Sequence, residues 1–486
     1  MMTHGEVQRL DPALRRLIGV VLLGGIMGIL DGSMIAVAAD RLAHDFGTSL
    51  ATVSWVSASY LLALTVTIPV TAWAVDRVGG RRLWLGGLAV FLIGSILCGL
   101  AWNVESLNAF RVLQGIGAGL VDSLMLTLLA RAAGASRVGR VMGLMGVVGS
   151  SGPVLGPIVG GIILDSLSWR WMFLVNVPIG LLALALSLRI VPRDADNTAP
   201  VGRLDVIGIA LLGPGVAAGV LALSQVAERG TFTSTWALAP LAAAFLLLGG
   251  YAWHALRPRR AAPLIDLRLF TRPSFAASVL VGGLVGLVTF ASIFALPLYQ
   301  QLVRGHDTFE AALLLAPLGI GSAISMPLTG RRSDRVGARL LALGGAILAG
   351  LSALVFTQIG PQTSQVWVTA ASFTIGFGLG AVGAPTISSL YRTLPAELVP
   401  QGSSVLYMLN QLGASIGIAA VAVVMLTAGD GNPLSGFHAA FWTVAVALAV
   451  LILASNLLPG RLAPQEPREQ PPAGSDTALA GAEEPA

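Results

Sequence analysis

The chain has 486 residues, of which 55% are hydrophobic and only 11% are charged. Soluble domains carry about a quarter charged residues, so this composition excludes a soluble globular protein and predicts that lipid surrounds most of the chain. The net charge is +5, and the basic residues other than histidine are all arginines. The single cysteine, Cys98, excludes an intrachain disulfide, and we expect no metal site.

The apolar runs last about 18–25 residues, as membrane-spanning helices do, whereas barrel strands alternate over about ten residues. We therefore predict an all-α polytopic membrane protein with fourteen transmembrane helices, each long enough to cross a hydrocarbon core of about 30 Å. In chain order, the predicted spans are Leu17 to Ala39, Ser54 to Val75, Leu83 to Ala101, Leu107 to Ala130, Val141 to Leu164, Trp171 to Leu188, Val206 to Leu223, Trp236 to Leu256, Phe275 to Tyr299, Ala311 to Leu328, Leu340 to Ile359, Val366 to Leu390, Val405 to Thr427 and Phe437 to Leu458.

The two ends of the chain need separate interpretation. The first apolar run could be a signal peptide, because Ala36-Val37-Ala38 resembles a cleavage site. We reject this interpretation because the run is too long for such a segment and contains Asp31. Residues 459–486 are rich in Pro, Ala and Glu, with too little apolar surface to fold, so we predict a disordered cytoplasmic tail.

The distribution of arginine predicts the orientation in the membrane. If the N-terminus is cytoplasmic, the outer loops carry only Arg41, Arg170, Arg229 and Arg304, and all the other arginines except Arg111 fall in cytoplasmic segments. Such an excess is typical of cytoplasmic loops. We therefore predict a protein of the bacterial inner (cytoplasmic) membrane with both termini in the cytoplasm. Because the arginines are spread over many segments, they do not indicate nucleic-acid binding.

An internal repeat predicts the domain organisation. The sequence DRVGGR at Asp76 to Arg81 recurs as DRVGAR at Asp334 to Arg339. The first copy follows the second predicted span and the other follows the tenth. We therefore predict two six-helix bundles with two helices inserted between them, and a substrate site between the bundles. The predicted units are a cytoplasmic N-terminus at 1–16, the N-terminal bundle at 17–192, the inserted helices and their linkers at 193–272, the C-terminal bundle at 273–458 and the tail at 459–486.

Five motifs follow one another in the N-terminal part of the chain. They are LDGSMIAVA at Leu30 to Ala38, DRVGGRR at Asp76 to Arg82, RVLQGIGAG at Arg111 to Gly119, GSSGPVLGPIVGG at Gly149 to Gly161 and WRWMFLVNVPIG at Trp169 to Gly180. Together they resemble the motifs of the fourteen-span drug/proton antiporter family of the major facilitator superfamily. The resemblance implies the major facilitator fold and proton-driven transport by alternating access. In that superfamily, the motif of the fifth span is associated with exporters rather than importers.

Three ionisable residues lie within predicted spans: Asp31, Arg111 and Asp122. Each such residue costs about 2.5–3.5 kcal/mol in a membrane helix, so it needs a partner or a function. No histidine lies deep within a span, so we predict that carboxylates carry protons, Asp31 first and Asp122 second. Two alternatives stay open: Asp31 and Arg111 form a permanent ion pair that only fixes helix packing, and Asp122 simply faces a polar neighbour.

Gln114 lies one turn from Arg111 on the same helical face, so we expect it to orient Arg111 or to contact a ligand. The two DRVG loops place an acid and several arginines at cytoplasmic helix ends. We predict that they form salt bridges between the bundles that lock an inner gate, although they could also serve only as topology anchors. The predicted gating residues are Asp76, Arg77, Gly79, Arg82, Asp334, Arg335, Gly337 and Arg339.

Small residues dominate the predicted fifth span. Gly152, Gly156 and Gly160, with Gly161 beside them, have a spacing that lets helix backbones approach closely, and Pro157 removes a helix hydrogen bond. We therefore predict close helix packing in this span. The family resemblance adds a further role, a pliable helix that seals the pore during export.

Aromatic and amide side chains are candidates for lining an apolar cavity for planar or cationic molecules. The alternative for each is ordinary packing, lipid contact or an interfacial anchor. The candidates are Trp55, Tyr60, Phe290, Phe294, Tyr299, Gln300, Gln301, Tyr407 and Asn410.

No GxxxxGK[ST] phosphate-binding loop is present, so we predict a proton gradient as the energy source and no cofactor. The expected partners are protons, a small-molecule substrate and the lipid bilayer, with no obligate protein partner and no nucleic acid. We predict a transporter, not an enzyme: a proton-coupled exporter of drugs, antibiotics or other small amphipathic molecules. The alternatives are an exporter of an endogenous metabolite or lipid, a proton-coupled nutrient symporter, and a membrane scaffold or sensor that transports nothing.

Overall fold

The computed structural model describes residues 11–48, 50–134, 137–194, 205–231, 233–257, 263, 265–395, 398–429 and 432–460. The predicted all-α architecture is confirmed, since the described residues form helices and connecting turns and no strand. Residues 1–10 of the predicted N-terminal segment and residues 461–486 of the predicted tail lie outside the described residues. The helices are Pro12–Phe46 (α1), Leu50–Val78 (α2), Gly80–Gly99 (α3), Val104–Ala133 (α4), Val138–Ser166 (α5), Trp171–Leu174 (α6), Asn176–Ile190 (α7), Val206–Arg229 (α8), Thr235–Leu256 (α9), Leu267–Thr271 (η1), Pro273–Leu302 (α10), Thr308–Leu313 (α11), Ala316–Val336 (α12), Ala338–Phe356 (α13), Gln365–Thr393 (α14), Val399–Gly429 (α15) and Pro433–Ser455 (α16).

Twelve helical segments of the described chain are long and apolar enough to cross a membrane. Two more apolar stretches, Trp55–Thr71 in α2 and Val138–Gly149 in α5, are shorter. Helices α2 and α5 themselves each have 29 residues, which corresponds to about 44 Å. The chain is therefore a multi-pass membrane protein, and the number fourteen stays a prediction.

Two of the predicted spans are interrupted helices. The sixth consists of α6 and α7, and the tenth consists of α11 and α12. Pro178 stands in the first turn of α7 and Pro317 in the first turn of α12. Because proline has no N–H to donate to the preceding turn, a helix restarts near each of these prolines. Hydropathy alone did not predict either break.

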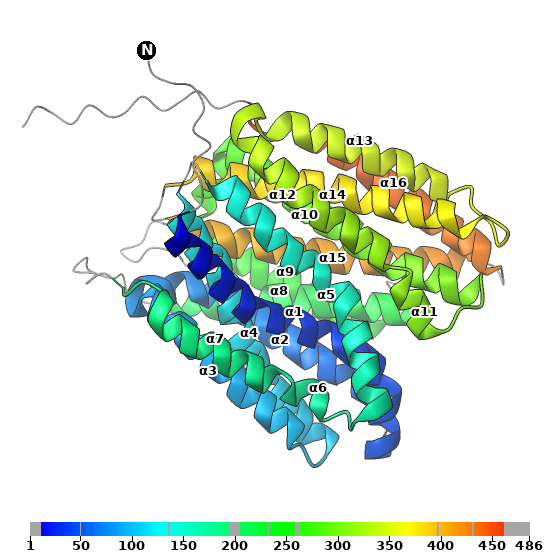
Figure 1. Cartoon of the computed structure of the whole chain (residues 1–486), viewed down its shortest axis with the longest axis horizontal. Coiled ribbons are helices and arrows are strands. Elements are labelled where there is room, and N and C mark those ends of the chain that lie inside the picture. Colours follow the sequence, from blue (N-terminus) through cyan, green and yellow to red (C-terminus); the bar gives the residue numbers. More distant parts are fainter. Residues whose placement is uncertain are drawn as a thin grey trace, which may run out of the picture.

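The helices form two bundles with a helix pair beside their junction (Figure 1). Helices α1–α7 make up one bundle and α10–α16 the other, and α8 contacts both through α2 and α15. Gly213 of α8 faces Val66 of α2, and Gly219 of α8 faces Leu412 of α15. The inserted pair thus packs along one side of the junction between the bundles.

The described contacts between the two bundles concentrate toward the end that carries the two DRVG turns. Ser404 Oγ on α15 donates a hydrogen bond to the carbonyl oxygen of Ile68 on α2 at 3.1 Å. Thr127 Oγ1 on α4 donates to Ser403 Oγ at 3.4 Å. On the other side of the junction, Gly143 of α5 packs so closely on α12 that an added Cβ would lie 2.6 Å from the Met326 carbonyl oxygen. The bundles are therefore closed against each other at this end.

The glycines of α5 let this helix pack directly on α1. A Cβ added at Gly152 would overlap the side chain of Ile29, and one added at Gly156 would overlap Ser33. Ser33 Oγ also donates a hydrogen bond to the Gly152 carbonyl oxygen at 3.0 Å. Gly160 is buried and Gly161 half-buried, whereas the Pro157 side chain lies outside the described residues. This close approach positions the part of α1 that carries Asp31.

We predict that Gly152→Ala lowers the thermal stability of the purified protein, because the new methyl group forces α1 and α5 apart at a cost of about 1–3 kcal/mol. Gly149→Ala is the matched control on the same helix, since a Cβ there meets nothing within 4 Å. It should leave the melting temperature unchanged or raise it. Equal melting temperatures for the two variants would contradict the packing described here.

Candidate functional site

A buried ion pair lies at the centre of the N-terminal bundle. Asp31 on α1 and Arg111 on α4 are 2% and 0% exposed, and the Arg111 Nη1 group donates to Asp31 Oδ2. Arg111 Nη1 also donates to Gln114 Oε1 at 2.8 Å, and Arg111 Nε donates to the carbonyl oxygen of Val56 at 3.0 Å. The pair therefore ties α1, α2 and α4 together at lipid depth.

Amide donors complete the coordination of Asp31. Gln114 Nε2 donates to Asp31 Oδ1 at 2.9 Å, and Asn176 Nδ2 on α7 donates to the same oxygen at 3.0 Å. Both amides also donate to Ser95 Oγ on α3, at 2.9 and 3.2 Å, and Ser95 passes its own proton to the Phe173 carbonyl oxygen. Asp31 thus accepts hydrogen bonds from a guanidinium and two amides, as a buried carboxylate requires.

Gln114 has every polar atom of its side chain engaged. Its oxygen accepts from Arg111 and, at 3.6 Å, from the Cys98 thiol, while its nitrogen donates to Asp31 and Ser95. The structure therefore places Gln114 as a bridge between the two charged groups. The expectation that it orients Arg111 agrees with this geometry, and a ligand contact would require one of these bonds to break.

Tyr60 on α2 forms one wall of this cluster. The Arg111 guanidinium carbon lies 4.1 Å from the centroid of the Tyr60 ring and 5.6 Å from that of Phe173, distances at which a cation is attracted by an aromatic face. Arg111 Nη2, which is buried, has no hydrogen-bond partner among the described residues. The Tyr60 hydroxyl donates to the Gly28 carbonyl oxygen at 3.2 Å.

Asp122 lies deeper along α4 and has a different environment. It is 5% exposed, and its Oδ2 accepts a hydrogen bond from the Tyr407 hydroxyl at 2.9 Å. Its other oxygen, Oδ1, has no hydrogen-bond partner among the described residues. Tyr407 belongs to α15, so this bond connects the two bundles.

The other candidates for the cavity lining are dispersed. Tyr299 is buried, stacks on Phe437 at 4.4 Å and donates to the Gly360 carbonyl oxygen at 3.0 Å. Asn410 Nδ2 donates to the Gly282 carbonyl oxygen at 3.1 Å. Trp55 is 45% exposed. Phe290, Phe294 and Gln301 are half-buried and Gln300 is buried. Of the aromatic candidates, the structure brings Tyr60 and Tyr407 to the carboxylates.

The first DRVG turn is fixed by residues of its own bundle. Gly79 has φ = 93°, a left-handed conformation that favours glycine. The Asp194 carboxylate accepts from the backbone N–H groups of Arg81 at 2.8 Å and Arg82 at 3.2 Å, and so caps α3. Arg77 is exposed.

Asp76 precedes this turn and pairs with Arg131 of α4 at 3.8 Å. Partial burial raises the pKa of the Asp76 carboxyl above its ordinary value, and the nearby Arg131 cation opposes that shift. Both residues belong to the N-terminal bundle. This ion pair therefore holds α2 to α4 and does not join the two bundles.

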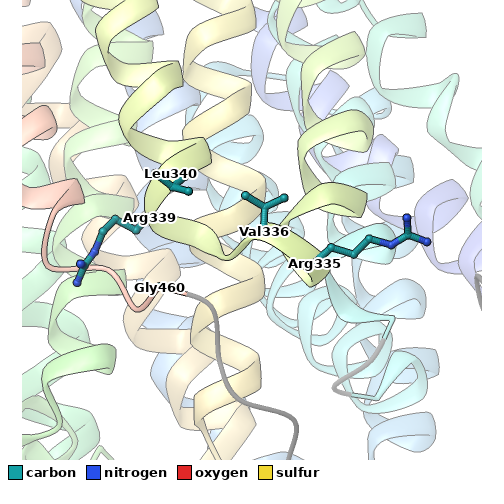
Figure 2. Close-up of a pocket in the computed structure, with 5 residues that line it drawn as sticks. All are labelled: Arg335, Val336, Arg339, Leu340 and Gly460. Atoms are coloured by element: carbon teal, nitrogen blue, oxygen red, sulfur yellow. The ribbon is translucent and has the colours of Figure 1, made fainter. Parts of the chain in front are cut away.

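The second DRVG turn borders a surface pocket lined by Arg335, Val336, Arg339, Leu340 and Gly460. Figure 2 shows the two guanidinium groups pointing in opposite directions, with the aliphatic side chains between them. Arg339 Nε donates to the Leu458 carbonyl oxygen at 3.0 Å, and Gly337 has φ = 92°. The Asp334 side chain lies outside the described residues. The described contacts of both turns thus stay within one bundle each, and the gating role stays a prediction.

Comparison with known proteins places this architecture in a family. Residues 21–418 match the Major Facilitator Superfamily. The chain belongs to that superfamily. It is 36% identical over 420 residues to a multidrug resistance protein B homolog of Mycobacterium tuberculosis, covering 86% of this chain and 77% of that protein. It is also 28% identical to the lincomycin resistance protein LmrB of Listeria innocua, covering 85% and 87% of the two chains.

The solved structures support the same fold. The human organic anion transporter MFSD10 (TETRAN) superposes with a TM-score of 0.66 at 17% identity, covering 92% of this chain and 100% of that one. At this identity the likeness concerns the fold alone. As a member of the major facilitator superfamily, the protein is a membrane transporter that acts on small molecules, and it is not an enzyme.

Sequence reasoning missed three residues that hold the site. Asn176 and Ser95 support Asp31, and Asp194 caps α3 behind the first DRVG turn. Asn176 carries a usable signal, because an amide stands there within an apolar run and two residues before a proline. Ser95 carries none, because a serine inside a membrane helix commonly bonds its own backbone.

The geometry predicts that the ion pair is energetically coupled. Asp31→Asn or Arg111→Gln alone strands a buried charge, at a cost of about 3–5 kcal/mol. The double variant strands none and should melt at a higher temperature than either single variant. Thermal unfolding of the four proteins in detergent measures this. Additive losses in the double variant would contradict a direct pair.

Proposed function

We propose that the protein is a proton-coupled exporter of amphipathic small molecules across the cytoplasmic membrane. The observation that carries the proposal is the set of buried charges at lipid depth, with Asp31 and Arg111 paired in one bundle and Asp122 at the junction with the other. Intramembrane carboxylates mark proton or substrate pathways in transporters. Alternating access then moves the two bundles around these groups.

The proposed topology has fourteen spans, formed by two six-helix bundles and the inserted pair α8 and α9, as in the fourteen-span drug/proton antiporter family. The cytoplasmic excess of arginine supports cytoplasmic termini. In that orientation, the end where Ser404 contacts Ile68 and Thr127 contacts Ser403 is the cytoplasmic end. The arrangement of the bundles then corresponds to a state closed toward the cytoplasm.

Drugs and antibiotics are the proposed substrates because two of the relatives bear resistance names, the multidrug resistance protein B homolog and the lincomycin resistance protein. The GSSGPVLGPIVGG motif, associated with exporters through the family resemblance, favours export over uptake. An endogenous metabolite or lipid remains the second candidate. Deletion cells exposed to drug and lipid panels separate the two candidates by which compound accumulates.

The direct test uses everted membrane vesicles, in which an exporter loads cargo into the lumen. Vesicles that contain the protein should accumulate a fluorescent lipophilic cation when energised, and an uncoupler should abolish the accumulation. The Asp31→Asn/Asp122→Asn variant should not accumulate the probe. The matched control is Asp45→Asn, a partly exposed carboxylate at the end of α1, which should behave as wild type. Accumulation that resists the uncoupler would exclude proton coupling, and uptake reversed in direction would favour symport.

A further inference from the structure

The two buried carboxylates differ in how their charge is balanced. Asp31 has a cation in contact, Arg111, and two amide donors. Asp122 has a single donor, the Tyr407 hydroxyl, and no ion-pair partner among the described residues. Binding a proton at Asp31 would leave the Arg111 cation uncompensated in a water-poor bundle, which is costly. Binding a proton at Asp122 leaves no other charge unbalanced.

We infer that Asp122 is the proton carrier of the transport cycle, and that its bond to Tyr407 is the latch through which its charge state controls closure of the cytoplasmic end. In this assignment Asp31 and Arg111 form a fixed polar core that stays charged. The inference rests on the proposed proton-coupled export and specifies which residue performs the coupling. It reverses the order of the two carboxylates that the sequence suggested.

The groups around Asp122 define the path of the proton. A Cβ added at Gly28 would lie 3.5 Å from both Asp122 Oδ1 and the Tyr60 hydroxyl, so both atoms border the same glycine surface. The titratable groups that face Asp122 are Tyr60 from α2 and Tyr407 from α15, and the next charges beyond the Tyr60 ring are Arg111 and Asp31. The unpartnered oxygen thus borders Tyr60, whose ring the Arg111 guanidinium contacts.

Tyr407 converts the charge of Asp122 into a force between the bundles. A hydrogen bond to an ionised acceptor is roughly twice as strong as one between neutral groups. Ionised Asp122 therefore holds α15 against α4, which closes the end where Ser404 meets Ile68. A protonated Asp122 has a weaker bond to Tyr407, so the same end opens more readily.

This latch gives the order of events that antiport requires. With Asp122 ionised and cargo bound, the Tyr407 bond favours closure of the cytoplasmic end, and cargo leaves on the outer side. A proton from the outer medium then binds the Asp122 carboxylate, and the weakened bond lets the cytoplasmic end open. The proton passes to cytoplasmic water, Asp122 is again ionised, and new cargo binds. One proton enters for each time the empty carrier returns.

The test measures opening of the cytoplasmic end as a function of pH. Ser404→Cys in a Cys98→Ser background places the only thiol at the buried contact with Ile68. In everted vesicles, its labelling by an impermeant thiol reagent should rise about fivefold or more from alkaline to acidic buffer, after normalisation to denatured protein at the same pH. Adding Asp122→Asn or Tyr407→Phe should make labelling high and independent of pH.

Two comparisons separate this latch from a general structural effect. Tyr251→Phe also removes a buried tyrosine hydroxyl, whose bond goes to Ile265 away from the junction, and should leave the pH response intact. Asp122→Asn should lose proton-driven accumulation and keep downhill exchange of the lipophilic cation, which an unfolded protein does not perform. A pH response that survives Asp122→Asn and disappears in Asp31→Asn would overturn the assignment. In that case wild-type proton-driven accumulation would still support the proposed function, whereas its absence in wild type would defeat both.

Discussion

A guanidinium buried without water must find acceptors and a counter-charge, and the N-terminal bundle is built around meeting that need for Arg111. Asp31 supplies the charge, Gln114 and the Val56 carbonyl supply acceptors, and the ring of Tyr60 covers one face. These groups come from α1, α2 and α4, so satisfying one side chain fixes the relative positions of three helices. The tight glycine contact between α1 and α5 extends this constraint to the helix that meets the second bundle. Removing the positive charge alone therefore changes the packing of a whole bundle.

The sequence predicted the parts of this arrangement that local cost makes visible. A charge inside an apolar run is conspicuous, so Asp31, Arg111 and Asp122 were identified from the printed sequence, and helical spacing placed Gln114 beside Arg111. The helical architecture followed from run length, because lipid leaves a helix few alternatives. Partners that depend on tertiary structure were not predictable. Nothing local in Ser95 or Asn176 assigns them to Asp31, and the bond from Tyr407 to Asp122 joins residues 285 positions apart. The breaks before α7 and α12 were missed because mean hydropathy does not register a single proline.

The DRVG turns illustrate how one motif serves two purposes. Positive φ angles at Gly79 and Gly337 explain why glycine recurs at that position in both copies. The neighbouring acids and arginines, however, contact residues of their own bundle, with Asp76 on Arg131 and Arg339 on the Leu458 carbonyl. In the closed arrangement the described bridges between bundles are made instead by hydroxyl groups on α4 and α15 and by glycine contacts between α5 and α12. Weak contacts of this kind suit a junction that has to separate and re-form in every cycle.

The central claim is that Asp31 stays charged with Arg111 while Asp122 gains and loses the proton. Infrared difference spectroscopy of the purified protein between alkaline and acidic pH observes this directly, because only a protonated carboxyl absorbs in the region of the C=O stretch of a carboxylic acid. The account predicts one such band that appears on acidification in wild type and in Asp31→Asn and is absent in Asp122→Asn. A band that persists in Asp122→Asn and vanishes in Asp31→Asn would contradict it.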